Sequence, residues 1–363
     1  MTEPLREILP ELGFYTLAGH TESPADLLGE CRDAERIGLG SAFISERFNV
    51  KEAASLTGAA AAVTSELGIA TGVTNHNTRH PLVTAAWATT VHRLSGGRFA
   101  LGLGRGFDML FDAIGLPRVT FAQLDDFADL MRRLWRGEMI FGHDGPAGSY
   151  PYLGLDATFD EDIPIMLAAL GPKSMEFGGG VMDGVILHTF FTDDALERCV
   201  AHVRRGAEGA GRDPTSVRVW SVLAVLCDQP EEVRLRALVG RMGTYLQGYG
   251  DLLVRVNDWD PAVLGRFRAD DVVASVGGAI DAKADRAQLE HIATLIPDEW
   301  IAASAVGSAD TCARRVHDQF ARGADGVVMH AATPQDLSPV VMAYRGTRDA
   351  RFAGRSTNPG RRP

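Results

Sequence analysis

Four of the ten histidines, His20, His76, His188 and His330, lie close to the ends of apolar segments that we predict to be strands. In barrels of alternating strands and helices, active sites lie on the loops that follow the strands. Imidazole titrates near neutral pH, so a histidine at such a position can transfer protons. A hydrogen-bonded structural role is the alternative for each. We select His76 and His188 as the candidates for proton transfer.

Two glycine-containing segments at neighbouring strand ends suit a phosphate. Residues 104–106 follow a strand predicted at residues 99–103, and residues 170–173 follow the next one. Glycine lets backbone amides approach a ligand, and the free amides of a helix N-terminus attract anions. Neither segment matches a P-loop or a dinucleotide fingerprint, and easier packing is the alternative role of the glycines. The predicted phosphate site consists of Gly104, Arg105, Gly106, Leu170, Gly171 and Lys173.

A glycine also interrupts the third predicted strand, at Gly72 in the sequence TGVTN of residues 71–75. Glycine inside a barrel strand indicates a bulge or a close approach of the backbone to a ligand. A planar ring could therefore stack against this strand. A glycine that only eases packing is the alternative.

Short apolar strands alternate with longer helical patterns, which positions these groups. The predicted strands are residues 12–18, 41–45, 68–74, 99–103, 165–169, 184–188, 217–226 and 326–330. The predicted helices are residues 24–37, 51–65, 81–94, 121–136, 194–209 and 308–322, with two more from Pro172 and near Leu337. Apolar strands covered by helices indicate a parallel sheet, and about eight such units favour an α/β fold of the (β/α)₈ TIM barrel type. An open doubly wound sheet is the alternative.

We predict that residues 1–363 form a single TIM-barrel domain with insertions. Residues 137–162 lack helical periodicity and predict a loop or hairpin insertion. Residues 230–298 are too long for an ordinary crossover and predict a mainly helical insertion. Residues 351–363 are rich in Gly, Pro and Arg and predict a flexible tail.

Composition and charge exclude several classes of protein. The chain has 36 basic and 47 acidic residues, a net charge of −11, which disfavours nucleic acid as a partner. Its four cysteines are scattered without a CxxC pair, which disfavours a zinc ribbon and fits a cytoplasmic protein. Residues 1–20 do not resemble a signal peptide, and no apolar stretch approaches the ~20 residues that span a bilayer, so we expect no membrane partner.

Around the glycine-containing segments and strand ends described above, the chain resembles the luciferase-like monooxygenase superfamily, and within it the deazaflavin (coenzyme F420)-dependent oxidoreductases. The matching stretches keep the order they have in that family, and together they are specific. They are residues 39–48 (LGSAFISERF), 68–81 (GIATGVTNHNTRHP), 94–106 (LSGGRFALGLGRG) and 164–187, with weaker similarity through 305–329. The resemblance implies a barrel with insertions, a small-molecule substrate and a homo-oligomer, for which a dimer is the expected form.

The resemblance also implies roles for individual residues. The bulge would back the cofactor ring, with Gly72–Val73 as the bond that matches a common non-proline cis peptide. Thr74 and Asn75 would meet the edge of the ring. The two glycine-containing segments would hold the ribityl phosphate.

Two departures from the family pattern concern the groups that handle protons. Many members carry Asp-His after the second strand, where this chain has Glu46-Arg47. Glu46 can still accept hydrogen bonds from the ring, whereas Arg47 stays protonated and cannot act as a base. Some members place an acid after the fourth-strand glycines, where this chain has Phe107. The substrate therefore cannot be carried over.

These observations predict an F420-dependent oxidoreductase that transfers a hydride between the deazaflavin C5 carbon and an organic substrate, with Glu46, His76 and His188 as catalytic candidates. An FMN-dependent monooxygenase of the same fold is the alternative, because one phosphate site serves both cofactors. Cations near the C-terminal mouth of the barrel would suit the acidic tail of the deazaflavin. Alternatively, they are ordinary surface charges that only contact solvent. These cations are Arg47, Lys51, Arg79 and Lys173.

Two further alternatives belong to other classes. A metal-dependent barrel hydrolase would require an HxH pair after the first strand, where His20 stands alone. A protein that binds the cofactor without turnover is the other.

Overall fold

Eight parallel strands form a closed barrel in the computed structural model, which describes residues 7–19, 21, 23–48 and 50–362. The strands are β1 (Leu9–Tyr15), β2 (Leu39–Ile44), β3 (Gly68–Thr71), β4 (Phe99–Leu103), β7 (Ile165–Ala168), β8 (Gly184–Ile186), β9 (Arg218–Cys227) and β11 (Gly326–His330). They pair in that order, and β11 returns to pair with β1. This closure confirms the predicted TIM barrel.

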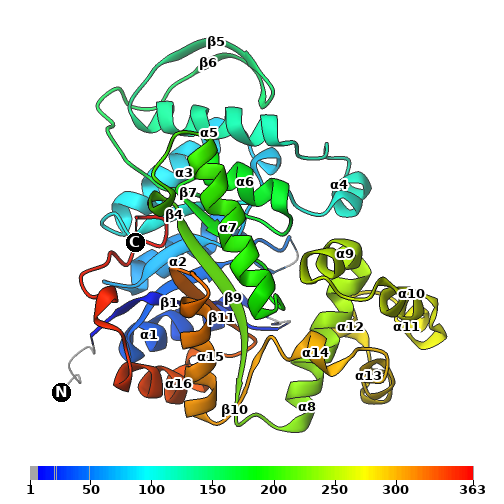
Figure 1. Cartoon of the computed structure of the whole chain (residues 1–363). Helices are drawn as coiled ribbons and strands as arrows, with labels where there is room; N and C mark the ends of the chain where they lie inside the picture. Colours follow the sequence, from blue (N-terminus) through cyan, green and yellow to red (C-terminus); the bar gives the residue numbers. More distant parts are fainter. Residues whose placement is uncertain (1–6, 20, 22, 49, 363) are drawn as a thin grey trace.

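A helix follows each barrel strand, and together these helices surround the barrel (Figure 1). They are α1 (Leu27–Ile37), α2 (Ala53–Val63), α3 (Pro81–Leu94), α5 (Phe121–Trp135), α6 (Pro172–Val181), α7 (Asp193–Gly209), α15 (Ala309–Ala321) and α16 (Pro334–Gly346). The sequence analysis did not predict helix α4 (Asp108–Ile114), which precedes α5. Short 3-10 turns are η1 (Pro24–Asp26), η2 (His76–Thr78), η3 (Pro214–Ser216) and η5 (Ala350–Phe352).

Apolar side chains from different strands fill the inside of the barrel. Phe43 of β2 and Trp220 of β9, which are not neighbouring strands, meet edge to face with ring centroids 5.0 Å apart. Six smaller or aliphatic side chains complete this buried cluster: Ala70, Ala100, Met166, Ile186, Val222 and Val328. The barrel is therefore a packed core, and any ligand must bind at one of its ends.

Two insertions lie outside the barrel in Figure 1. Strands β5 (Ile140–Gly145) and β6 (Gly148–Leu153) form an antiparallel hairpin within residues 137–162. The second insertion consists of α8 (Glu231–Arg234), the π-helix η4 (Leu235–Gly240), α9 (Arg241–Asn257), α10 (Pro261–Ala269), α11 (Asp271–Ser275), α12 (Ile280–Lys283), α13 (Arg286–Ala293) and α14 (Asp298–Ile301). A short strand, β10 (Ala305–Gly307), then extends the sheet beside the end of β9.

The N-terminal end of the barrel is closed by the segment at residues 353–362, so the prediction of a flexible tail there is wrong. Asn358 is 2% exposed, and its side-chain amide donates to the carbonyls of Gly97 (2.8 Å) and Phe99 (2.9 Å). The indole of Trp220 donates to the Pro359 carbonyl at 2.8 Å. These partners are far away in sequence, which explains why composition alone indicated a tail.

The first strand begins three residues earlier than predicted and ends at Tyr15. Its Glu11 is fully buried, and its carboxylate accepts hydrogen bonds from Tyr344 (3.1 Å) and Arg348 (2.7 Å) near the end of the chain. The hydropathy pattern of neighbouring residues did not predict a buried charge in this strand, because the side chains that neutralise it are far away in the sequence. Within the described residues, no helix is long and apolar enough to cross a membrane.

Candidate functional site

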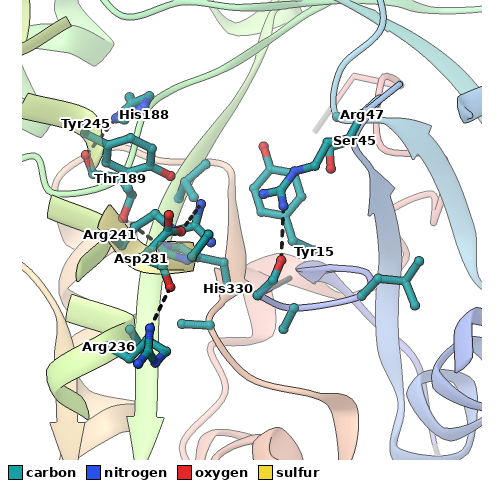
Figure 2. A pocket seen from close by; sticks show the side chains of 18 of the residues that line it. Tyr15, Ser45, Arg47, His188, Thr189, Arg236, Arg241, Tyr245, Asp281 and His330 are labelled. Carbon is teal, nitrogen blue, oxygen red and sulfur yellow. Dashed lines mark hydrogen bonds and ion pairs between the residues drawn. The ribbon is translucent and has the colours of Figure 1, made fainter. Parts of the chain in front are cut away.

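A cavity of about 920 Å³ opens at the C-terminal end of the barrel. Figure 2 shows Tyr15, the last residue of β1, with Ser45 and Arg47, which follow β2, on one side of it. Arg241 and Tyr245 of helix α9 lie on the other side. The volume lies within the ~300–1,000 Å³ usual for small-molecule sites. The helical insertion thus forms a wall that the barrel loops alone would leave open.

Aromatic side chains of α9 form much of that wall. Tyr245 and Tyr249 stack with ring centroids 5.4 Å apart, and each meets the edge of the His188 ring, at 4.6 and 5.1 Å. Phe107, which follows β4, packs on Tyr249 at 5.2 Å. Position 107, where an acid was missing, therefore contributes an apolar contact instead.

His188 lines the cavity just after β8, as predicted. Its Nδ1 lies 3.0 Å from the Thr189 carbonyl, which can only accept, so Nδ1 carries the proton. Its Nε2 lies 3.0 Å from the Tyr249 hydroxyl and accepts that hydrogen bond. Burial lowers the pKa of His188 to about 4. The ring is therefore neutral at pH 7 and presents an acceptor toward the cavity side.

Of the other three histidines selected from the sequence, one lines the cavity, one lies outside the cavity wall, and one lies outside the described residues. His330 also lines the cavity; its Nε2 is 2.7 Å from the Thr189 hydroxyl, and burial lowers its pKa to about 3. His76 lies in η2 and packs against Phe127 of α5 with ring centroids 5.4 Å apart. Burial lowers its pKa to about 4, and it is not part of the cavity wall. His20 lies outside the described residues.

Glu46 lies behind the cavity wall, where its carboxylate is fully engaged. Arg79 donates to both carboxylate oxygens, at 2.8 and 2.7 Å, and the Ala53 amide donates at 3.2 Å. The Thr74 hydroxyl donates a short hydrogen bond to the same group. The side chain is only 2% exposed. Glu46 therefore ties the loops after β2 and β3 together, and the bond to a cofactor ring predicted for it has no free acceptor in this arrangement.

The loop after β3 contains the predicted cis peptide bond, Gly72–Val73, and Gly72 lines the cavity. A Cβ atom at Gly72 would lie 2.9 Å from the ring of Tyr15 and 3.0 Å from Phe43. The Asn75 side chain donates to the Gly104 carbonyl at 2.8 Å, which joins this loop to the one after β4. Thr74 is buried with its hydroxyl on Glu46, so both polar side chains position the loops.

The two segments predicted to bind phosphate lie at the ends of adjacent strands, because β4 pairs with β7. Among the described residues, the backbone amides of Arg105, Gly106 and Lys173 have no hydrogen-bond partner. Gly106 has a φ of 72°, which suits glycine. Gly171, next to Leu170, is the N-cap of α6; because Pro172 has no amide hydrogen and the Ser174 amide donates to the Gly171 carbonyl, the Lys173 amide is the unpaired donor of this first turn. Unpaired amides at two adjacent loops are the donors that a phosphate requires.

Arg105 and Lys173, the cations of this pair of loops, are exposed. Arg105 donates to the Val119 carbonyl at 2.9 Å and lies over the Phe121 ring, 5.1 Å from its centroid. These contacts hold its guanidinium beside the loop after β4. Arg79, by contrast, pairs with Glu46 and Glu52, which removes it from the cations considered for an acidic tail.

Backbone strain also marks this end of the barrel. Five non-glycine residues of the described chain have positive φ, and four of them follow barrel strands: Leu17 (54°), Phe190 (62°), Asp228 (49°) and Ala331 (67°). Such residues cluster at functional sites, where the surrounding structure holds them in place. The sequence carried no signal for them. Nor did it single out Tyr15, Arg241, Tyr245 or Tyr249, although the two tyrosines of α9 share a helical face at i, i+4.

Comparison with known proteins agrees with this architecture. A 5,10-methylenetetrahydromethanopterin reductase of Methanolobus tindarius is 29% identical over 306 residues, which cover 81% of this chain and 86% of that protein. An F420-dependent glucose-6-phosphate dehydrogenase of Beutenbergia cavernae is 32% identical over 189 residues, 47% of this chain and 55% of that protein.

Solved structures show the same fold. The coenzyme F420 dependent tetrahydromethanopterin reductase of Methanopyrus kandleri superposes with a TM-score of 0.77 at 20% identity, covering 95% of this chain and 100% of that one. An F420-dependent secondary alcohol dehydrogenase, solved with an F420-acetone adduct, gives 0.70 at 18% identity over 93% of this chain and 99% of that one. The sequence profile of luciferase-like monooxygenases matches residues 11–326. The chain therefore belongs to the luciferase-like monooxygenase family.

Proposed function

We propose that this protein is an F420-dependent oxidoreductase acting on a small organic molecule. The unpaired amides of the loop after β4, next to the N-terminus of α6, carry the proposal, because they offer a phosphate site beside a cavity of cofactor size. Relatives named as F420-dependent support the choice of cofactor. When bound, the deazaflavin supplies a hydride acceptor or donor at its C5 carbon.

The residues of the chain would bind and orient this group. The amides of Arg105, Gly106 and Lys173 would hold the phosphate, and the backbone at Gly72 and Val73 would back the ring. The aromatic side chains of α9 would cover it and exclude water. Glu46 and Asn75 would fix the loops that carry these groups.

His188 is the cavity residue that we propose for the proton. Its Nε2 accepts from Tyr249, and its lowered pKa keeps it neutral at pH 7. Because the Tyr249 hydroxyl occupies this nitrogen, a proton from a substrate would reach it through that hydroxyl, and the neutral ring is a poor proton donor. His76 packs against α5 outside the cavity wall, so we assign it no contact with substrate.

A titration with three cofactors tests this proposal. We expect F420 to quench protein fluorescence at lower concentration than FMN, and FMN to bind more tightly than riboflavin, which lacks the phosphate. Copurification of FMN together with failure to bind F420 would replace the proposal by a flavin monooxygenase. Equal affinity for FMN and riboflavin would remove the phosphate site.

A further inference from the structure

The cavity wall differs in charge from the rest of the molecule. The chain has a net charge of −11, whereas four cationic and only two anionic side chains line the cavity. The two histidines there are neutral, since burial lowers the pKa of both. The cations are Arg47, Lys51, Arg236 and Arg241, and the anions are Glu232 and Asp281. A local excess of positive charge in an acidic protein indicates a site for an anion.

Two of these cations lie on the barrel side of the cavity and have no carboxylate partner among the described residues. Arg47 donates to the Gly19 carbonyl at 3.1 Å. Lys51 is 3% exposed and donates to the carbonyls of Thr16 (3.1 Å) and Leu17 (2.5 Å). Burial, and then the charge of Arg47, lowers the pKa of Lys51 to about 7. Arg47 is thus a cation without a carboxylate partner in the described chain at the end of β2, and Lys51 beside it is only partly charged at neutral pH.

The insertion contributes the facing cations. Arg241 pairs with Asp281 at 2.9 Å, and Arg236 donates to the Asp281 carbonyl at 3.1 Å. In Figure 2, Arg241 and Arg47 lie on opposite sides of the cavity. Burial lowers the pKa of Arg47, and the positive charge of Arg241 lowers it further. The Asp281 carboxylate acts in the opposite direction on the pKa of Arg47. Both guanidinium groups line the same cavity, so an anion between them could accept hydrogen bonds from both.

We propose that the substrate carries an oxyanion, a carboxylate or a phosphate, that binds between Arg47 and Arg241. This inference rests on the proposed function, because it names the substrate class of the same site. Guanidinium groups match carboxylate and phosphate oxygens through paired N–H donors. In the barrel, β2 is separated from β4 by β3, so this position is distinct from the loops assigned to the cofactor phosphate.

Calorimetric titration of the F420-saturated protein with phenyl phosphate, benzoate and benzyl alcohol tests the inference. We expect at least one of the two anions to bind about tenfold more tightly than the alcohol, the size of effect expected for a charged hydrogen bond. Arg47→Gln and Arg241→Gln should each raise the Kd of that anion about tenfold and leave the alcohol unaffected. Equal binding of anions and alcohol, or an unchanged Kd in both variants, would overturn the inference.

Arg266→Gln is the matched control, because Arg266 is an exposed cation on α10 of the same insertion. It should leave every Kd unchanged. Arg241→Gln also leaves Asp281 without its ion-pair partner, so a folding defect in that variant would shift the decision to Arg47→Gln. Arg47 has no such pair among the described residues.

The Kd of F420 itself separates this inference from the proposed function. If both variants weaken F420 about tenfold and the anions compete with it, the cations hold the cofactor and the inference is wrong. If F420 does not bind the unaltered protein, the proposed function fails. The same anion titrations on the cofactor-free protein then still decide whether Arg47 and Arg241 form an oxyanion site.

Discussion

The two ends of the barrel differ in what their arginine side chains contact. At the N-terminal end, Arg218 is fully buried and donates to the carbonyls of Pro10 (2.6 Å) and Asn358 (3.1 Å). Its guanidinium also lies over the Trp220 ring, 4.5 Å from the centroid. At the C-terminal end, Arg47 and Arg241 are only partly buried and line a cavity from opposite sides. At one end the arginine binds carbonyls of the closing segment at residues 353–362 and of β1, and at the other the arginines line a cavity that is open to a ligand.

Because of this difference, the two ends of a barrel strand contribute to different properties: its start to stability and its end to ligand binding. Positions at the start of a strand contact the closing segment at residues 353–362, and positions just past its end contact the cavity. Changes at the N-terminal end should therefore lower the free energy of unfolding and leave affinity per folded molecule intact. Changes at the cavity should do the reverse.

Deletion of residues 357–363 should have the largest effect. It removes the partners of Arg218, Trp220 and Ser41, and exposes the starts of several strands. At ~1–3 kcal/mol for each buried group left unsatisfied, we expect a loss of about 4 kcal/mol or more, measured by urea unfolding. Deletion of residues 362–363 alone removes the exposed ion pair of Arg362 with Asp213 and should cost under about 1 kcal/mol. Equal effects of the two deletions would contradict the closing role.

Two glycines at the opposite ends of β3 sharpen the comparison, one at its start and one directly after its last residue. A Cβ atom at Gly68, where β3 begins, would lie 1.9 Å from the Thr357 carbonyl, whereas one at Gly72 would press on the Tyr15 ring at 2.9 Å. Gly68→Ala should lower the free energy of unfolding by about 2–3 kcal/mol and keep F420 affinity. Gly72→Ala should displace Tyr15 into the cavity and weaken F420 about tenfold or more, with the smaller loss of stability.

Melting temperature and F420 Kd measured on both variants decide the matter. Loss of affinity in Gly68→Ala, or retained affinity in Gly72→Ala, would contradict the separation. A larger residue at position 72, such as valine, would press harder on both Tyr15 and Phe43 than alanine does, and its loss of stability would confuse the two effects.

The smallest effect concerns pH. The pKa of His188 is lowered to about 4 in the fold, against ~6.5 in an unfolded chain. Between these values the unfolded chain binds more protons, so the free energy of unfolding falls as pH decreases from about 6.5 to 4 and levels off below. His188→Gln should remove about 1–2 kcal/mol of the difference between pH 7 and pH 5. Tyr249→Phe, which keeps the imidazole, should retain it; parallel curves for His188→Gln and the unaltered protein would refute the assignment.

The barrel could be predicted from sequence because its signals are local. Apolar strands end at glycines and polar residues, and the helical period of α5 places Leu124, Phe127 and Leu134 in the core, where the structure has them. The closing segment could not be predicted in this way. Asn358 depends on carbonyls about 260 residues earlier in the chain, and no composition rule reports such a partner.

The candidate site could be predicted only where the backbone requires a particular residue type or where a residue directly follows a strand. Gly72 and Gly106 stand where a side chain would collide with Tyr15 and Phe111, so glycine itself was the signal. His188 was found by its position after a strand. The ion pair of Glu46 was not predicted because its partner Arg79 lies on a different loop, and Arg241 was missed because the fold of the insertion decides where it points.

The closing segment at residues 353–362 also bears on the order of events during synthesis. Ribosomes make the chain from its N-terminus, and domains begin to fold as they emerge. Asn358 and Pro359, which bond to the starts of β4 and β9, are translated after every strand of the barrel. The nascent barrel therefore exposes the polar edges of those strands until translation has passed Pro359. A ribosome stalled before that codon would present an open barrel to chaperones and proteases.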